Sequence, residues 1–275
     1  MAAVAWQAMR ITTRNAQFQI WESLLGNRRT RHREGEFVVH GVRPISLALE
    51  HGWEVRDVLF DADRRLSPWA AEVLERTGRA RHIAMAPELL AELGEKTDTV
   101  PELVAIVATR PDELDRIPAG PDLLTVVFDR PTQPGNIGSL IRSADAFGAN
   151  GVIVTGHAAD VYDPKAVRAS TGSVFAVPTV RVSSPREVLA WVDGLPARPR
   201  IVGTDESGVV DVDEYDFTGP QVVLIGNETV GLSAAWHELA DAMVRIPMQG
   251  SASSLNAANA ATAVLYEAAR QRRRR

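Results

Sequence analysis

Residues 246–260 read IPMQGSASSLNAANA, a loop of small and polar residues that runs into an alanine-rich helix near Ser254 and Asn256. This loop and two other segments each lie where a strand ends. Residues 224–232, LIGNETVGL, end one continuous apolar strand, and residues 136–149, NIGSLIRSADAFGA, follow another. Continuous apolar strands are typical of a parallel sheet that is buried on both faces, and such sheets bind ligands at the carboxyl ends of their strands. The three segments therefore predict one ligand site on an α/β sheet.

Strands alternate with helices through the rest of the chain, which predicts an α/β fold. In the second half we expect strands at 123–128, 151–155, 200–205 and 221–226, and helices at 141–148, 186–194 and 255–271. In the first half we expect strands at 37–41, 55–61, 81–85 and 104–109, and helices at 15–25, from Pro44, at 68–78 and at 87–95. The segment 111–122 holds three prolines and is the predicted linker, so we expect domains over residues 1–117 and 118–275.

Basic residues gather at the two ends of the chain, although the formal net charge is -5. Residues 1–43 carry seven arginines and three glutamates, and the tail from Arg270 to Arg275 carries five arginines. Local basic patches bind phosphate groups whatever the net charge. The polar segment 27–36 is predicted to be an exposed loop whose arginines contact RNA, although solvated ends without a partner explain the charge alone equally well. The candidate RNA-binding residues are Arg28, Arg29, Arg31 and Arg33.

Several classes of protein are not supported by the sequence. There are no cysteines, which excludes disulfides and thiolate chemistry, and the six histidines lack the spacing of metal ligands, so no metal site is expected. We find no apolar run of membrane-spanning length and no signal-peptide pattern, and therefore expect a cytoplasmic protein. The phosphate-loop and GxGxxG patterns are also missing, which argues against a nucleotide-dependent oxidoreductase.

Each of the three segments has a simple structural explanation when it is taken alone. The sequence Gly-Asn-Glu can form an ordinary turn, Ser254 can be a helix N-cap, and Arg142 can pair with Asp145 on its own helix. Their order and spacing together are much more specific.

Taken together, the segments resemble the three motifs of the SpoU/TrmH family of RNA 2′-O-ribose methyltransferases. In the first motif an asparagine is followed six residues later by an arginine and then by FGA, as at Asn136, Arg142 and 147–149. The second motif is G-x-E-x-x-G-L, and the third is IPM followed by SLN. Residues 168–178, RASTGSVFAVP, are similar to the family's RAS-x-G stretch. The front half resembles the L30e-like RNA-binding domain of many members, with His40 where many have glutamate.

The resemblance implies a SPOUT fold, in which a small L30e-like α/β domain precedes an α/β parallel sheet that contains a trefoil knot. It also implies that S-adenosyl-L-methionine binds in the knotted domain. The residues expected to hold this cofactor are Gly226, Asn227, Gly231, Ile246, Met248, Ser254 and Leu255. The implied catalytic residues are Asn136, Arg142, Glu228 and Asn256.

The implied reaction is methylation of a ribose 2′-hydroxyl in structured RNA by a homodimer that needs no metal. Arg142 either accepts the hydroxyl proton or, because arginine ordinarily keeps its own proton, binds a phosphate and orients the hydroxyl. The separate N-terminal domain favours 23S rRNA over tRNA as the substrate. A role in antibiotic resistance and a housekeeping role both stay open. A non-catalytic RNA-binding factor is disfavoured because Arg142, Glu228 and Asn256 are all present.

Overall fold

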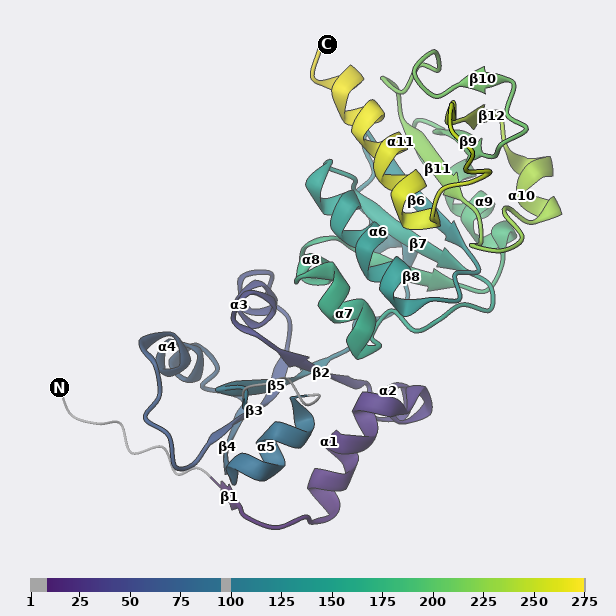
Figure 1. Cartoon of the computed structure of the whole chain (residues 1–275). Helices are drawn as coiled ribbons and strands as arrows, with labels where there is room; N and C mark the ends of the chain where they lie inside the picture. The colour runs from purple at the N-terminus through teal and green to yellow at the C-terminus, as the bar shows by residue number, and fades with distance from the viewer. Residues whose placement is uncertain (1–8, 95–99, 275) are drawn as a thin grey trace. The chain divides into compact units, whose positions relative to one another are not determined.

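The computed structural model describes residues 9–94 and 100–274, which form two compact units (Figure 1). The first unit comprises the described residues up to Arg110 together with Tyr162–Val167. The second comprises Pro111–Val161 and the described residues from Arg168 onward. The chain thus leaves the first unit at the start of the predicted linker. The later return of Tyr162–Val167 to that unit has no counterpart in the sequence analysis.

The first unit is built on a five-stranded mixed sheet with the strand order β1-β4-β3-β5-β2. Its strands are β1 (Met9–Ile11), β2 (Glu36–His40), β3 (Val55–Asp61), β4 (Arg81–Met85) and β5 (Leu103–Ala108). Its helices are α1 (Ala16–Gly26), α2 (Arg28–Glu34), α3 (Val42–Glu50), α4 (Pro68–Arg76) and α5 (Pro87–Leu93). Strands β1, β4 and β3 are parallel, whereas β5 is antiparallel to both β3 and β2.

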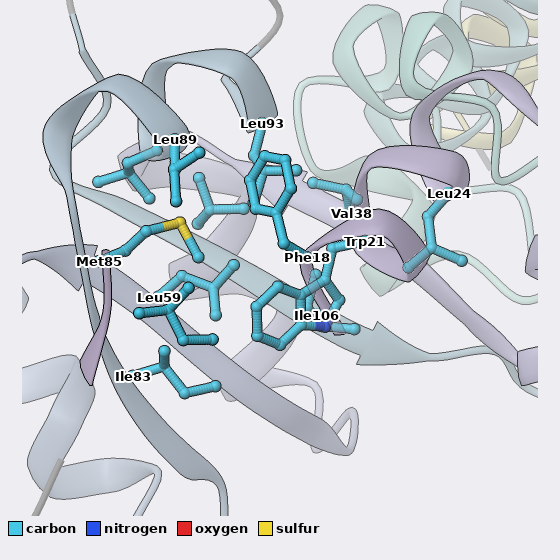
Figure 2. Packing of buried hydrophobic residues seen from close by; sticks show 13 residues of the cluster. Phe18, Trp21, Leu24, Val38, Leu59, Ile83, Met85, Leu89, Leu93 and Ile106 are labelled. Atoms are coloured by element: carbon cyan, nitrogen blue, oxygen red, sulfur yellow. The ribbon is translucent and has the colours of Figure 1, made fainter. Parts of the chain in front are cut away.

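Helix α1 covers one face of this sheet with the apolar stripe that its sequence predicts. Phe18, Trp21 and Leu24 are fully buried against strand residues and α5, as Figure 2 shows. The side chain of Asn15 caps the helix by accepting a hydrogen bond from the backbone N–H of Phe18 at 2.9 Å. Trp21 also donates its indole N–H to the buried carboxylate of Asp57 at 3.1 Å, so its one polar atom is satisfied.

The expectation of an exposed loop over residues 27–36 is wrong, because most of this segment forms α2. Asn27 caps the helix through its side chain, and Gly35 ends it with a left-handed φ of 62°. Arg31 is buried, and its guanidinium donates to the backbone carbonyls of Leu24 and Leu25 at 2.6 and 3.3 Å. It therefore satisfies carbonyls at the end of α1 and is not an exposed contact for RNA.

The second unit is built on a seven-stranded sheet with the order β10-β12-β9-β11-β6-β7-β8, and all of its ladders are parallel. Its strands are β6 (Leu124–Asp129), β7 (Gly151–Thr155), β8 (Thr179–Val182), β9 (Arg200–Thr204), β10 (Val210–Asp211), β11 (Gln221–Ile225) and β12 (Ala242–Arg245). The expected α/β parallel sheet is confirmed. The trefoil knot that the resemblance implies stays a prediction.

Helices cover both faces of this sheet. They are α6 (Pro134–Ala146), α8 (Ser173–Ala176), α9 (Pro185–Asp193), α10 (Ala234–Leu239) and α11 (Ala257–Arg272), with a 3₁₀ turn η1 (Leu114–Arg116). Helix α7 (Pro164–Ser170) is divided between the two units, because Tyr162–Val167 belong to the first. Val188 of α9 and Trp236 of α10 pack on one face in a common core cluster. Helices α6 and α11 lie side by side, and the hydroxyls of Ser143 and Thr262 join them at 2.7 Å (Figure 1).

Helix α6 begins seven residues earlier than the predicted helix 141–148 because Pro134 occupies its first turn, where proline needs no hydrogen-bond donor. The short elements β1, β8, β10, β12, α7, α8 and α10 had no individual prediction. None of the described helices is both long and apolar enough to cross a membrane.

The basic end of the chain is partly used within the fold. Arg270 pairs with Glu267, and Arg272 donates to the backbone carbonyls of Asp122 and Gly219, both at 2.6 Å. These two arginines therefore stabilise the end of α11 and are not a free basic tail. Arg275 lies outside the described residues.

The buried position of Arg31 leads to a stability prediction. Arg31→Ala leaves carbonyls of α1 without donors and creates a cavity, so we expect a loss of about 2–4 kcal/mol in the free energy of unfolding. Urea denaturation followed by tryptophan fluorescence measures this loss. The matched control is Arg33→Ala, whose side chain is 70% exposed, and it should cost less than about 0.5 kcal/mol. Equal effects of the two substitutions would contradict the structural role of Arg31.

Candidate active site

A cavity of about 540 Å³ lies at the carboxyl ends of β9, β11 and β12. Parallel strands bring their carboxyl ends to one edge, which is why segments distant in sequence meet there. All seven residues predicted to hold the cofactor line the cavity: Gly226, Asn227, Gly231, Ile246, Met248, Ser254 and Leu255. The predicted segments 224–232 and 246–260 therefore both contribute to the lining of one cavity.

The loop after β11 is closed so tightly that only glycine fits its first position. A Cβ atom on Gly226 would lie 2.5 Å from the backbone carbon of Gly231 and 2.5 Å from the backbone nitrogen of Leu232. The backbones of Asn227 and Gly231 exchange hydrogen bonds at 3.0 and 3.1 Å, and Gly231 has a left-handed φ of 66°. The loop thus presents backbone groups directly to the cavity.

Three of the four predicted catalytic residues form one hydrogen-bonded cluster. Asn136 donates its side-chain N–H to Glu228 Oε1 at 3.0 Å, and its amide oxygen accepts from the side chain of Asn256 at 3.1 Å. The cluster joins the first turn of α6, the loop after β11 and the residue before α11. Polar side chains from all three motifs therefore converge next to the cavity.

Glu228 is held by further donors from the loop before α6. Thr132 donates its backbone N–H and its hydroxyl to Oε2 at 3.1 and 3.2 Å, and the N–H of Gln133 donates to Oε1 at 3.3 Å. Burial raises the pKa of Glu228, but the hydrogen bonds from Asn136 and from backbone amides outweigh it, so the net shift is downward. The carboxylate is therefore ionised at neutral pH and accepts hydrogen bonds only.

Asn256 also begins α11. Its side-chain oxygen accepts from the backbone N–H groups of Ala258 and Asn259 at 3.0 and 3.3 Å. The alternative that Ser254 is the helix N-cap is therefore wrong, and Ser254 lines the cavity instead. Because Asn256 caps the helix with its oxygen, its amide nitrogen points to Asn136 with a fixed orientation.

Arg142 is not brought into this cluster. Six residues along α6 correspond to a rise of about 9 Å and a rotation of about 240°, so Arg142 leaves the helix on a different side from Asn136. Its side chain is exposed, and the described part of the chain gives it no hydrogen bond or ion pair. Asp145, the alternative partner on the same helix, accepts a hydrogen bond from Ser173 at 2.6 Å.

Arg130 is a site residue that the sequence analysis missed. It is one of two described non-glycine residues with positive φ, at 50°. This turn aims its backbone carbonyl at the side chain of Asn227, which donates to it at 2.6 Å. Its guanidinium contacts the buried carboxylate of Asp129 at 3.1 Å and the carbonyl of Gly231 at 3.3 Å. Arg130 thus ties the end of β6 to the cavity loop, and no sequence pattern marks an arginine for positive φ.

Thr204, Asp205 and Glu206 also line the cavity without having been predicted. Thr204 is the last residue of β9, and Asp205 and Glu206 follow it, at the end of the predicted strand 200–205 and just beyond it. Polar residues just after a buried strand of a parallel sheet are a signal that could have found them.

The remaining predicted residues lie in the first unit. Arg28, Arg29 and Arg33 are exposed on α2. Arg33 pairs with Glu34, and Arg28 donates to His32 at 3.3 Å. No group of three possible metal ligands occurs within residues 9–94 and 100–274, and the expectation of a metal-free site stays a prediction.

A cavity at the carboxyl edge of a parallel sheet, beside a carboxylate and two amides, defines an α/β protein with a ligand site of enzyme type. The chain belongs to the SpoU rRNA Methylase family: residues 123–266 match that family, and residues 15–105 match the SpoU L30e-like domain. The family resemblance drawn from the sequence is therefore confirmed.

Relatives of known identity support this assignment along nearly the whole chain. The chain is 65% identical over 268 residues to the 23S rRNA (uridine(2479)-2'-O)-methyltransferase of Streptomyces viridochromogenes, covering 96% of this chain and 93% of that protein. The crystal structure of the SpoU methyltransferase AviRb from Streptomyces viridochromogenes, in complex with the cofactor AdoMet, matches with a TM-score of 0.90 and 64% identity, covering 94% of this chain and 98% of that one. An AdoMet-bound rRNA methyltransferase from Sinorhizobium meliloti matches with a TM-score of 0.87 and 30% identity over 96% of this chain and 98% of that one.

The tight loop at Gly226 leads to a binding prediction. Gly226→Ala forces a methyl group against the backbone of Gly231, so the loop must open, and we expect ligand affinity at the cavity to fall at least about tenfold. Calorimetric titration with S-adenosylhomocysteine measures the change. Gly219→Ala is the control, since a Cβ atom there meets nothing within 4 Å. Unchanged affinity in folded Gly226→Ala protein would show that the loop does not form the binding wall.

Proposed function

We propose that this protein transfers a methyl group from S-adenosyl-L-methionine to a ribose 2′-hydroxyl of 23S rRNA. The observation that carries the proposal is the placement of Glu228, Asn136 and Asn256 beside a cavity that all seven expected cofactor residues line. The names of the relatives from Streptomyces viridochromogenes and Sinorhizobium meliloti support both the cofactor and the rRNA substrate.

The cavity fits the cofactor chemically. Gly226 allows the loop after β11 to close against the backbone of Gly231, and this loop would offer N–H and C=O groups to the edge of an adenine ring. Ile246, Met248 and Leu255 would supply apolar contacts from the cavity lining. When bound, the cofactor supplies an electrophilic methyl group on a sulfonium ion.

The protein's own residues would orient the ribose. Each side-chain amide carries two N–H groups. Asn136 uses one to bind Glu228, and Asn256 uses one to bind Asn136, so each has a second N–H that can donate to a ribose oxygen. Glu228 is fixed by several donors, so the amides are set before RNA arrives. Such preorganisation is worth several kcal/mol, up to about 10 kcal/mol in the best cases.

We infer that Arg142 completes the site of a partner subunit in a homodimer. It is exposed on α6 and cannot share a side of that helix with Asn136, although the family's first motif contains both. A two-fold dimer that pairs the exposed side of α6 with its copy would bring the guanidinium to the second site. There it either accepts the hydroxyl proton or binds a phosphate and orients the hydroxyl.

Under this proposal the two predicted domains have different roles. Residues 118–275 carry methyl transfer, and residues 1–117 bind RNA, with Arg28, Arg29 and Arg33 on α2 as phosphate contacts. A cytoplasmic location follows from an rRNA substrate. Methylation of tRNA is the second candidate function. Conferral of antibiotic resistance stays a prediction.

The direct test is incubation of the protein with tritiated S-adenosylmethionine and either rRNA or tRNA. We expect label in 23S rRNA at a single ribose, detected by primer extension at low nucleotide concentration, where 2′-O-methylation stops the polymerase. Label in tRNA alone would replace the rRNA substrate, and no label in any RNA by folded protein would overturn the proposed activity.

For Arg142 we expect a loss of rate without a loss of cofactor affinity. Arg142→Ala should lower single-turnover methyl transfer at least about a hundredfold, because proton transfer or positioning is removed, and Arg142→Lys should not restore it. Mixed dimers of Arg142→Ala and Asn136→Ala subunits contain one intact site, so a random mixture should recover about a quarter of wild-type activity. No recovery in verified mixed dimers would place Arg142 in its own subunit's site.

A further inference from the structure

The cavity has an acidic wall. Asp205 and Glu206 follow β9, and Glu228 follows β11. Among the residues that the structure describes, the cavity lining contains these three carboxylates and neither lysine nor arginine. A ligand in the cavity therefore meets an excess of negative charge, which attracts cations more than neutral molecules.

Asp205 holds its carboxylate in a fixed position at this wall. Oδ1 accepts hydrogen bonds from the backbone N–H and the hydroxyl of Ser207, at 2.9 Å for the backbone bond. Oδ2 lies on the side of Gly231, since a Cβ atom placed there would be 3.8 Å from this oxygen. The side chain is only 22% exposed, so water and salt screen its charge weakly.

The other two carboxylates are less effective toward a ligand. Glu228 already accepts several hydrogen bonds from Thr132, Gln133 and Asn136. Glu206 is exposed, so solvent screens it. The basic side chain of His237 lies close to Asp205, with its Nε2 3.9 Å from Oδ2. Burial raises the pKa of Asp205, but the Ser207 hydrogen bonds and His237 outweigh it and lower the value, so the carboxylate is ionised at neutral pH.

We propose that Asp205 makes the cavity select its ligand by charge, so that it binds the sulfonium methyl donor more tightly than the thioether product. The proposal rests on the proposed function, because it takes S-adenosylmethionine and S-adenosylhomocysteine as the two ligands. They have almost the same shape but differ by one positive charge at sulfur. A carboxylate several ångströms away distinguishes them by Coulomb energy, whereas backbone contacts to the adenine do not.

This selection would favour turnover. Asp205 attracts the cationic donor and gives no such attraction to the neutral product, so exchange of product for new donor becomes more favourable. Asp205 is therefore a residue that determines specificity, and it takes no part in the chemical step.

The test compares a cationic and a neutral ligand on the same variants by calorimetric titration. Sinefungin carries an amine in place of the sulfonium methyl group and does not react, so it serves as the cation, and S-adenosylhomocysteine is the neutral ligand. Asp205→Asn keeps an oxygen for Ser207 and removes only the charge.

We expect Asp205→Asn to weaken the binding of sinefungin about fivefold to tenfold and the binding of S-adenosylhomocysteine less than about twofold. Glu206→Gln should shift the ratio of the two ligand affinities in the same direction by a smaller factor. Asp193→Asn is the matched control. Asp193 is the last residue of α9, pairs with Arg198 and lies outside the cavity lining, so removal of its negative charge should leave the ratio of the two ligand affinities unchanged.

Equal weakening of both ligands by Asp205→Asn, or an unchanged ratio, would overturn the charge-selection proposal while leaving the proposed function intact. A shift of the same size in Asp193→Asn would also overturn it, because net charge would then be the cause. If the wild-type protein binds neither ligand, the proposed function itself fails.

Discussion

The hydrogen bonds around Glu228 hold together the parts of the chain on which the site depends. This residue follows β11, yet its donors Thr132, Gln133 and Asn136 lie more than ninety positions earlier, in the loop after β6 and the first turn of α6. The two strands are neighbours in a parallel sheet, so their carboxyl ends meet at one edge. Asn256 then attaches α11 to the same cluster through Asn136. One ionised carboxylate, which itself lines the cavity, thereby joins the start of α6, the loop after β11 and the start of α11.

The cavity depends on a second constraint, which is the close approach of backbone to backbone in the loop after β11. Gly226 packs against the main chain of Gly231, and no side chain fits between them. Arg130 supports this loop from the end of β6, through its carbonyl to Asn227 and its guanidinium to Gly231. A positive φ for an arginine costs about 1–3 kcal/mol, and such strain persists where surrounding contacts fix the residue. Arg130 contacts the loop that lines the cavity, and Thr132, two residues later, donates to Glu228, so this turn connects the geometry of the loop with that of the cluster.

The fold follows from the sequence where a local pattern is strong. Continuous apolar strands, the stripe of Phe18, Trp21 and Leu24, and proline at helix starts each have a physical meaning that is independent of the rest of the chain. The segment 27–36 shows the limit of this reasoning. Its basic composition indicates an exposed loop, but Asn27 caps a helix there and Arg31 finds buried carbonyls at the end of α1. Composition does not reveal such tertiary partners.

The sequence by itself determined the family, the parallel sheet, seven of the residues that line the cavity and the three members of the hydrogen-bonded cluster, because these residues belong to motifs that follow strands. Only the tertiary structure decided which neighbours those residues have. The order of strands brings the end of β9, with Asp205, to the same cavity, and the helical rotation of α6 turns Arg142 away from Asn136. Motif spacing measures distance along the chain, whereas charge and orientation at a site depend on which strands and helix sides become neighbours in space.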